Sequence, residues 1–453
     1  MPSNPSFTIL IIGGGVAGLA ASIGLRRKGH RVTVLESTST LQTLGGSLLI
    51  PPNAARVLSH YGLWEKFKEA ETIPKGNTTY RYEDGSVLEE VDYGAMEGAF
   101  GFPVMAIPRA RYQKLLYDAA IELGVQVRLS SRVKSLDENV PSVRLTTGDV
   151  IKGDIIIGAD GIKSTVRSTI LRDDDVQPIP ESIAYQCTIS RADMMSDPLT
   201  APLMEEGSIH SWYAPSRQII SGSDTSSSFY RLTLIFYPSS SPLTSSSDDI
   251  LAANSASSYR LGSTTYLRDL VSDFEPRVKK TIELVKPEDC FLWNIAHLPK
   301  LKSWVGESGR MVLLGDAAHA MVPHLGAGAA TAVEDGGVLA ECLSHPYVHS
   351  VSDIPRALRK YETLRRPRAE RIQAAALVTG QYKVIPDGPA QRKRDEKIAQ
   401  RMNRGNPKYE YWKAGGGLEW FYGYDFLMES TSTKALSDLS STVEQQGKKD
   451  HKL

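Results

Sequence analysis

The sequence predicts an α/β protein in which a parallel-sheet domain is interrupted by a mostly antiparallel β-sheet and is followed by helices. Two features support this prediction. Apolar, strand-like segments lead directly into glycine-rich turns and then into helices near residues 7–18 and 311–328, which is typical of a parallel sheet with crossover helices. Between about residues 180 and 290, alternating strand-like segments are separated by serine-rich stretches, which is typical of antiparallel hairpins.

Length and composition narrow the classes of protein. The chain has 453 residues, which is too long for one compact core and indicates two domains with extensions. Its formal net charge is zero, so charge favours neither nucleic acid nor an acidic membrane surface as a partner. The 3 cysteines are widely spaced and predict neither a disulfide framework nor a metal site. No apolar run reaches about 18 residues, so we expect no stable membrane insertion. We also expect the protein to be cytoplasmic and to be a monomer or a homodimer.

The N-terminal segment carries a dinucleotide-binding pattern in the context that the pattern requires. An apolar strand at residues 7–12 runs into Gly13-x-Gly15-x-x-Gly18, which opens a helix. In this pattern Gly13 permits a tight turn, Gly15 lets a pyrophosphate approach the backbone, and Gly18 lets helix and strand pack closely. The following strand ends at Glu36, whose carboxylate can accept both hydroxyls of an adenosine ribose and would repel a 2′-phosphate.

A second strand, loop and helix follow much later in the chain. The apolar segment Met311–Leu314 predicts a buried strand, and it delivers Asp316 to a loop that ends at Gly328. The next residues, 329–343, predict a helix. Glycines allow close approach of a ligand, and a helix N-terminus attracts negative charge, so this loop suits a phosphate or an electron-rich ring.

Three further segments predict helix starts that could contact a ligand. The two prolines before Asn53 indicate an extended loop that ends with Asn53 as the N-cap of a helix over residues 54–67. Arg109 begins another predicted helix, where a cation opposes the helix dipole unless an anionic ligand is present. A buried strand over residues 150–157 delivers Asp160 to a turn, and Ser164 is predicted to cap the helix that follows.

These elements divide the chain into a discontinuous parallel-sheet domain, an inserted β-sheet domain, a helical extension and a tail. We expect separate helices at 361–371 and 376–382 and a disordered, charged tail. The predicted boundaries are 1–72, 106–180 and 290–375 for the parallel-sheet domain, 73–105 and 181–289 for the β-sheet domain, 376–436 for the extension, and 437–453 for the tail.

The motifs together resemble those of the class A, single-component FAD-dependent monooxygenases, the para-hydroxybenzoate hydroxylase fold group, and within it the fungal salicylate-hydroxylase-like branch. The resemblance rests on the Gly13 motif with Glu36, on the segment from Gly158 through Arg167, and on the segment from Gly315 to Gly328, in the family's order and spacing. It implies a Rossmann-like FAD-binding domain of the glutathione-reductase type, with an inserted substrate-binding sheet.

The resemblance also implies a set of cofactor contacts and a reaction. Tightly bound FAD would be reduced by NADPH or NADH, which binds transiently, and would react with O2 to give a flavin C4a-hydroperoxide that oxidises an electron-rich aromatic, phenolic or indole substrate. The reaction would be a hydroxylation or an oxidative rearrangement in fungal-type secondary metabolism. The cofactor-binding residues that it implies are Gly13, Gly15, Gly18, Glu36, Gly46, Arg109, Asp160, Asp316, Gly328 and Ala329.

On the substrate side, the resemblance implies that Arg191 is catalytic and holds an anionic or carbonyl oxygen of the substrate. Arg191 follows a predicted strand whose alternation would turn it to the face opposite Ser190. Relatives that oxidise phenols have a tyrosine where this chain has Gly222. His319 is expected to fix the loop rather than to meet the substrate. The expected pocket residues are Tyr185, Tyr213, Pro323 and His324.

Two other functions stay open from the sequence. The first is FAD-dependent epoxidation of an isoprenoid double bond, which relatives with similar motifs perform. The second belongs to another class, a non-catalytic flavin-binding redox module. Substrate-dependent oxidation of NAD(P)H with oxygen incorporation separates enzyme from module, and product analysis separates hydroxylation from epoxidation.

Overall fold

A computed structural model gives the fold of the chain. In the described ranges, no helix is long and apolar enough to cross a bilayer. The described residues are 5–41, 46–70, 73–205, 207–223, 228–238, 260–344, 348–402 and 418–431.

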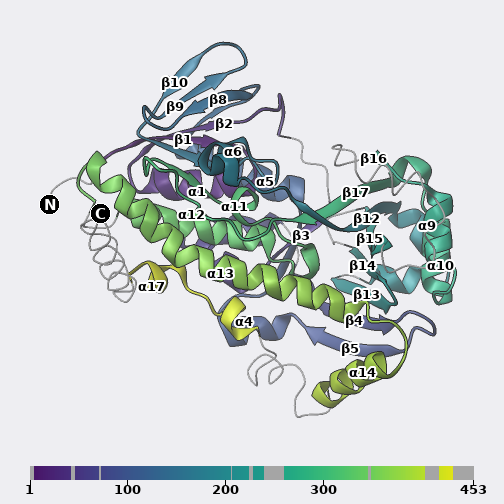
Figure 1. Cartoon of the computed structure of the whole chain (residues 1–453). Coiled ribbons are helices and arrows are strands. Elements are labelled where there is room, and N and C mark those ends of the chain that lie inside the picture. The colour runs from purple at the N-terminus through teal and green to yellow at the C-terminus, as the bar shows by residue number, and fades with distance from the viewer. Residues whose placement is uncertain are drawn as a thin grey trace, which may run out of the picture.

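A parallel sheet of five strands organises the first domain, in the order β18-β11-β1-β2-β7. Two of these strands, β1 and β2, are labelled in Figure 1. Each neighbouring pair is parallel, as the apolar strands of the sequence predicted. The fold class is therefore confirmed. The strands are β1 (Thr8–Ile12), β2 (Arg31–Leu35), β7 (Gln126–Arg128), β11 (Ile155–Gly158) and β18 (Met311–Leu313).

Helices α1 (Val16–Arg27) and α12 (Gly328–Ser344) pack closely against one another beside this sheet. A Cβ added at Gly336 would lie 2.8 Å from the backbone nitrogen of Ala21, so glycine is needed for the two backbones to approach. Almost all of α12 is buried. Both glycine-rich turns identified in the sequence lead into these two helices, and the turns therefore lie at the same end of the sheet.

The second sheet has eight strands in the order β16-β17-β12-β15-β14-β13-β4-β5. All neighbouring pairs are antiparallel except β13 with β4, which confirms a mostly antiparallel sheet. The strands are β4 (Gly76–Arg81), β5 (Val87–Asp92), β12 (Ile179–Ser190), β13 (Ser208–Ala214), β14 (Arg217–Ser223), β15 (Phe229–Phe236), β16 (Arg260–Leu261) and β17 (Cys290–His297).

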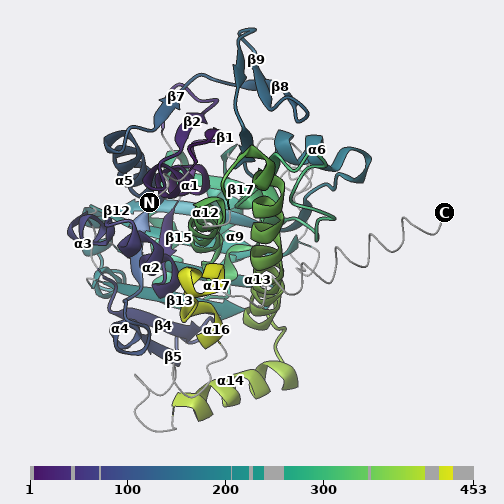
Figure 2. The same cartoon turned by 90° about the vertical axis from the view of Figure 1, so that its left-hand side faces the viewer.

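The two faces of this sheet have different neighbours. One face packs against α9 (Thr264–Leu270) and α10 (Pro276–Glu283) and forms a separate apolar core with them. The other face meets the C-terminal half of α13 (Ile354–Lys383) and the loop before α12 in a smaller apolar cluster that includes Ile235 and Val322. Figure 2 shows α13 running along the molecule past both sheets. This second face is the one that approaches the glycine-rich loop.

The remaining elements are the strands of two small sheets and the other helices. A three-stranded antiparallel sheet projects beside the parallel sheet, and a two-stranded pair precedes α2. They are β3 (Ser47–Ile50), β6 (Met105–Pro108), β8 (Val133–Asp137), β9 (Ser142–Leu145), β10 (Val150–Lys152), α2 (Pro52–His60), α3 (Trp64–Ala70), α4 (Gly94–Phe100), α5 (Arg109–Glu122), α6 (Thr165–Leu171), α7 (Arg191–Met195), α11 (Asp316–His319), α14 (Pro389–Met402), α16 (Glu419–Tyr422) and α17 (Phe426–Thr431).

Several predicted element boundaries were wrong. Asn53 is not an N-cap, because α2 begins at Pro52, where a proline is well tolerated in the first turn, and the Asn53 side chain donates to Glu334 instead. The predicted helix 54–67 is two helices, α2 and α3, and the predicted strand 150–157 is two strands, β10 and β11. The two helices predicted over 361–382 are one helix, α13, which continues through Pro367.

The inserted domain also contains elements that the sequence analysis missed. Strand β14 was not predicted because serine and glycine occupy its second half, and α9 and α10 were not predicted at all. The serine-rich segment 239–247 and the tail 437–453 lie outside the described residues. Strand β4 pairs in parallel with β13, which no local hairpin pattern could indicate.

A buried ionic network ties α12 to α13. Arg365 is fully buried and bridges two adjacent carboxylates, with its Nη2 2.7 Å from Glu334 and its Nε 2.8 Å from Asp335. Arg368 adds two bonds to Glu334 at 2.7 and 2.8 Å. Burial alone would raise the pKa of Asp335, but His319 and Arg365 outweigh it and lower this pKa to about 2. Burial would likewise raise the pKa of Glu334, but Arg368 and Arg365 outweigh it and lower this pKa, so both carboxylates are ionised.

We predict that Arg365→Met lowers the apparent free energy of unfolding by about 3–5 kcal/mol, because two fully buried carboxylates each lose one charged partner. The neighbouring Arg366 is the matched control, since it is one-third exposed and pairs with Glu362 and Glu370. Arg366→Met should cost less than about 1 kcal/mol. Urea denaturation followed by circular dichroism measures both, and equal losses in the two variants would contradict the role given to Arg365.

Candidate active site

The first glycine-rich turn has the geometry of a phosphate cradle. Gly13 adopts φ +108°, a conformation that side chains disfavour, and a Cβ at Gly18 would overlap the carbonyl oxygen of Gly13. A Cβ at Gly15 would meet nothing within 4 Å, so space is open beside the start of α1. In the described part of the chain, the backbone N–H groups of Val16 and Ala17 have no acceptor. Open space beside unpaired donors at a helix N-terminus suits a phosphate.

Glu36 closes this turn from the end of β2. Its Oε2 accepts from the backbone N–H of Gly14 at 2.7 Å, and its Oε1 accepts from the N–H of Thr38 at 2.8 Å. Burial alone would raise the pKa of Glu36, but the hydrogen bonds from Thr38 and Gly14 outweigh it and lower the pKa. The carboxylate is therefore ionised at neutral pH and retains acceptor sites for hydroxyl groups.

Two exposed charges flank the site without protein partners. Asp316 begins α11, and Arg109 begins α5. Within the described ranges neither side chain forms a hydrogen bond or ion pair, although the backbone N–H of Arg109 donates to the carbonyl of Gly46. Charges that the fold leaves uncompensated are available to a charged, hydroxyl-rich ligand.

The loop before α12 presents further backbone N–H donors, in addition to those at the start of α1. As far as the structure describes them, the N–H groups of Gly328 and Ala329 have no acceptor, and the first helical bond inside α12 runs from Thr331 to Ala327 at 2.8 Å. His319 fixes the loop at its other end, because its Nε2 lies 2.6 Å from Asp335. Asp335 also accepts from the N–H of Gly315 at 3.0 Å. The buried ionic network therefore holds this loop.

Asp160 is used differently. Its carboxylate accepts from the Ser164 hydroxyl at 2.5 Å and from the N–H groups of Thr165 and Val166 at 2.7 and 3.2 Å. Ser164 in turn caps α6, as the sequence predicted, by accepting from the N–H of Arg167. Burial raises the pKa of Asp160, and these hydrogen bonds oppose it. Asp160 thus organises the start of α6, and the structure shows it no second task.

Pro323 and His324 lie on opposite sides of the loop between α11 and α12. Pro323 is exposed, whereas His324 is buried against the eight-stranded sheet. His324 Nδ1 lies 2.5 Å from Gln218 Nε2, and His324 Nε2 lies 2.8 Å from the Tyr237 hydroxyl. Burial and the nearby Lys383 lower the pKa of His324 to about 3, so the ring is neutral. The sequence analysis missed both partners, because no local motif marks a residue that meets a distant loop.

Tyr185 does not lie where the sequence analysis expected. It is fully buried in the core beneath α9, stacked on Phe236 with ring centroids 6.1 Å apart. Its neighbour Ala184 packs in the other cluster, with Val322 of the loop. Because alternate residues of a strand face opposite sides of a sheet, Tyr185 points away from the loop, and we exclude it from the pocket.

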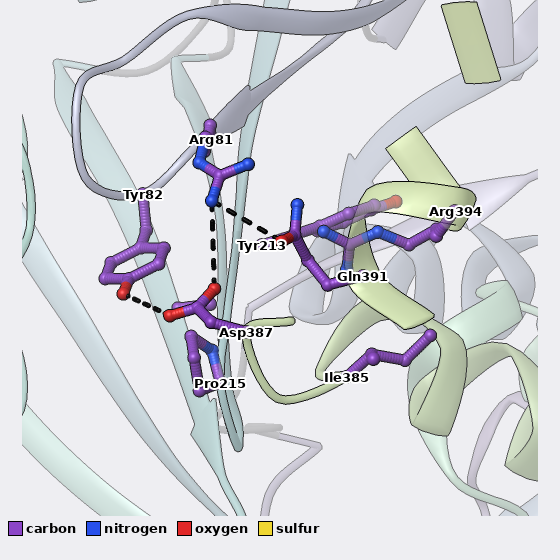
Figure 3. Close-up of a pocket in the computed structure, with 9 residues that line it drawn as sticks. Arg81, Tyr82, Tyr213, Pro215, Ile385, Asp387, Gln391 and Arg394 are labelled. Carbon is purple, nitrogen blue, oxygen red and sulfur yellow. Dashed lines mark hydrogen bonds and ion pairs between the residues drawn. The ribbon is translucent and has the colours of Figure 1, made fainter. Parts of the chain in front are cut away.

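Tyr213 lies at a small pocket between the β13–β14 hairpin and α14 (Figure 3). Arg81 pairs there with Asp387 and Asp395, and Tyr82 donates to Asp387 at 2.8 Å. Each of these charges has a partner of the opposite sign. This pocket is therefore a contact between α14 and the sheet, and it is not a candidate active site.

Arg191 occupies a different element from the one predicted. Strand β12 ends at Ser190, which caps α7 by accepting from the N–H of Asp193 at 3.0 Å, and Arg191 is the first residue of α7. Strand alternation therefore does not set the direction of the Arg191 side chain, and the orientation predicted from alternation was wrong. Its backbone N–H donates to Ser228 at 2.6 Å. No hydrogen bond or ion pair of its side chain occurs within the described residues.

Comparison with known proteins identifies this arrangement. Residues 6–232 and 268–376 match the family model described as "FAD binding domain". The chain belongs to this family. A relative of similar length, the FAD-dependent monooxygenase OpS4 of Beauveria bassiana, is 30% identical over 435 residues, covering 95% of this chain and 98% of the relative. The chain is an FAD-dependent monooxygenase, and the resemblance to class A flavin enzymes is confirmed.

Two other proteins are similar to this chain, one in sequence and one in fold. Hispidin-3-hydroxylase of Neonothopanus nambi is 31% identical over 383 residues, covering 82% of this chain and 87% of the relative. The crystal structure of a salicylate hydroxylase substrate complex has the same fold, with a TM-score of 0.75 at 22% identity over 94% of this chain and 97% of that one. The open space at Gly15 and the unpartnered Asp316 and Arg109 fit FAD.

The geometry around Glu36 and Asp316 predicts two different ways of losing FAD. Asp316→Ala should lower FAD retention strongly while leaving the melting temperature of the FAD-free protein unchanged, because the Asp316 side chain forms no hydrogen bond or ion pair with a described residue. Glu36→Ala should lower FAD retention less, but it should also destabilise the FAD-free protein, because the Gly14 and Thr38 N–H groups lose their acceptor. Absorbance at 450 nm after desalting measures retention. Full FAD occupancy in both variants would contradict the assignment, and the exposed Glu65→Ala is the control.

The buried imidazole of His324 predicts a pH dependence of stability. Its folded-state pKa of about 3 lies below the unfolded value of 6.5, so the unfolded chain takes up the proton first as pH falls. The resulting stability is fully present above pH 6.5 and is lost as pH falls from 6.5 towards 3. Burial lowers the pKa values of His30 and His210 to about 4, so these two residues change the stability in the same direction as pH falls.

We therefore predict that His324→Gln flattens the stability curve between pH 6.5 and 4. The slope should fall by up to about 1.4 kcal/mol per pH unit, the value for one proton. Denaturation at a series of pH values, for the native protein and the variant in parallel, measures the difference. Parallel curves would show that His324 is accessible to protons in the folded protein.

Proposed function

We propose that this FAD-dependent monooxygenase uses NADPH or NADH and O2 to insert one oxygen atom into an electron-rich aromatic, phenolic or indole substrate. The observation that supports this most is the double role of the segment from Gly315 to Gly328, which contains α11 and the loop before α12. One side of the segment presents Asp316 and the start of α12 to the cofactor, and the other side contacts the inserted sheet through His324. A substrate held between loop and sheet would therefore lie next to the cofactor.

In this proposal each residue has a defined task. The N-terminal glycine turn binds the pyrophosphate, and Glu36 accepts hydrogen bonds from the ribose hydroxyls. Asp316 and Arg109 contact the remaining polar and charged groups of the cofactor. The N–H groups of Gly328 and Ala329 stabilise negative charge on the reduced ring. Bound FAD supplies the activation of O2. The inserted residues 73–105 and 181–289 provide the substrate side, and 1–72, 106–180 and 290–375 provide the cofactor side.

The names of two similar proteins favour an aromatic substrate. Hispidin-3-hydroxylase and salicylate hydroxylase are both named for hydroxylation of an aromatic compound. Exposed Pro323 has the small, apolar surface against which a flat ring can lie. We infer a small, flat substrate with at least one acidic or carbonyl oxygen, which Arg191 would hold by charge-assisted hydrogen bonds.

Mass spectrometry of products from a panel of phenols, indoles and prenylated indoles tests this proposal. Under 18O2 and NAD(P)H, we expect one labelled oxygen atom on an aromatic product. A labelled epoxide of an isoprenoid chain would instead support the alternative epoxidase. Consumption of NAD(P)H that no substrate stimulates, with no labelled product, would support a flavin-binding redox module and contradict the proposal.

Arg191 generates a separate prediction. Arg191→Gln removes the charge and Arg191→Lys keeps it but loses the planar pair of donors, so both should retain FAD while product yield falls and peroxide release rises. The loss should be larger for Gln, on the order of 1–3 kcal/mol in transition-state terms. The exposed Arg268→Gln on α9 is the control. Unchanged rate and coupling in Arg191→Gln would show that Arg191 is not part of the site.

A further inference from the structure

The imidazole of His324 has no free polar edge. Its two nitrogens lie 2.5 Å from Gln218 Nε2 and 2.8 Å from the Tyr237 hydroxyl, and the Tyr237 ring stacks on it at an interplanar angle of 22°. An amide nitrogen can only donate, so Nδ1 accepts from Gln218 and Nε2 carries the proton given to Tyr237. A substrate therefore finds no donor or acceptor on this ring unless one of these bonds breaks.

Gly380, near the end of α13, makes room for this ring. A Cβ at position 380 would overlap the imidazole Cδ2 and would lie 2.6 Å from its Nε2 and 2.8 Å from the Tyr237 oxygen. Real Cβ atoms do not approach other atoms so closely, so a larger residue would displace the histidine. Glycine inside a helix normally costs about 1 kcal/mol relative to alanine. Its presence here matches the space that the ring requires.

The backbone of His324 is held in place as well as its side chain. Lys383, one turn after Gly380, donates from Nζ to the His324 carbonyl at 3.0 Å. The hairpin that carries Gln218 is itself attached to α13, because the N–H of Ser216 donates to the Val384 carbonyl at 3.0 Å. Side chain and main chain of His324 are thus fixed by β14, β15 and α13 together, while the preceding Pro323 stays exposed on the other side of the loop.

We propose that His324 is a positioning residue, which fixes the position of Pro323 and of the loop before α12 relative to the eight-stranded sheet. We further propose that Gly380 is required to leave space for the His324 ring, that is, to seat it. In this proposal His324 supports the loop, whereas the sequence-based expectation was that it lines the substrate pocket. The inference rests on the proposed function, because that function assigns the loop to the flavin. The seating of His324 by Gly380 is a property of the folded protein alone.

A stability experiment tests the seating without any cofactor. We expect Gly380→Ala to lower the melting temperature of the FAD-free protein by at least about 2 °C, although the same change in an unobstructed helix raises stability. In a His324→Ala background the ring is gone, so Gly380→Ala should become neutral or stabilising. The exposed Val378→Ala on the same helix is the control. An equal loss in both backgrounds, or a gain in the native background, would overturn the proposal.

A second experiment tests the positioning. Tyr237→Phe removes only the hydroxyl that meets His324, and neither this change nor Gly380→Ala removes a group assigned to the flavin. We expect both variants to bind FAD three- to tenfold more weakly, measured by quenching of FAD fluorescence, and to show a shifted visible spectrum. Unchanged FAD affinity and spectrum in both would overturn the positioning role.

Kinetics with whichever aromatic compound yields product separate positioning from substrate binding. Positioning predicts a fall in kcat and more peroxide for each NAD(P)H consumed, with KM unchanged, in His324→Ala, Tyr237→Phe and Gly380→Ala alike. A rise in KM confined to His324→Ala would make His324 a substrate ligand and overturn the proposal. If the native protein binds no FAD, the proposed function fails, whereas the melting experiment still decides whether Gly380 seats His324.

Discussion

The rest of the structure depends on the buried contact between Arg365 and the adjacent carboxylates of Glu334 and Asp335. Asp335 holds the first residues of the loop through the Gly315 N–H and the His319 ring, while Glu334 accepts from Asn53 of α2. One guanidinium thus connects α2, α12, α13 and the loop proposed to meet the flavin. Such a contact is costly to form, because ions must leave water, and costly to break, because the buried ions that remain would lose a partner of opposite charge.

The loop is therefore fixed from two directions by different chemistry. On the side of the parallel sheet it is held by ionised groups. On the side of the eight-stranded sheet the His324 ring is held by the neutral side chains of Gln218 and Tyr237, and the His324 carbonyl accepts from Lys383.

The residues that could be predicted from the sequence are those whose role depends on their immediate neighbours. The glycine turn with Glu36 requires only a strand, a turn and a helix, and the structure contains these elements at the predicted positions. Roles that depend on pairing of distant strands were not accessible. Tyr185 was placed on the wrong face because the register of β12 is set by β15 and β17, and Gln218 lies in a strand that serine and glycine concealed. Asn53 was misread because its partner, Glu334, is 281 positions away.

The position of Arg365 and of the residues beyond it sets the order in which this chain can complete its fold during synthesis. Glu334 and Asp335 leave the ribosome before Arg365 and Arg368, and those arginines lie against Tyr424 with guanidinium-to-ring distances of 5.1 and 3.8 Å. The parallel sheet also waits for β18, its last strand in the chain. The cofactor loop therefore acquires its support only when nearly the whole chain has been made, and long-range closure of this kind makes folding slow. A nascent chain that ends before residue 365 would lack both arginines that pair with Glu334 and Asp335, which disfavours early burial of α12.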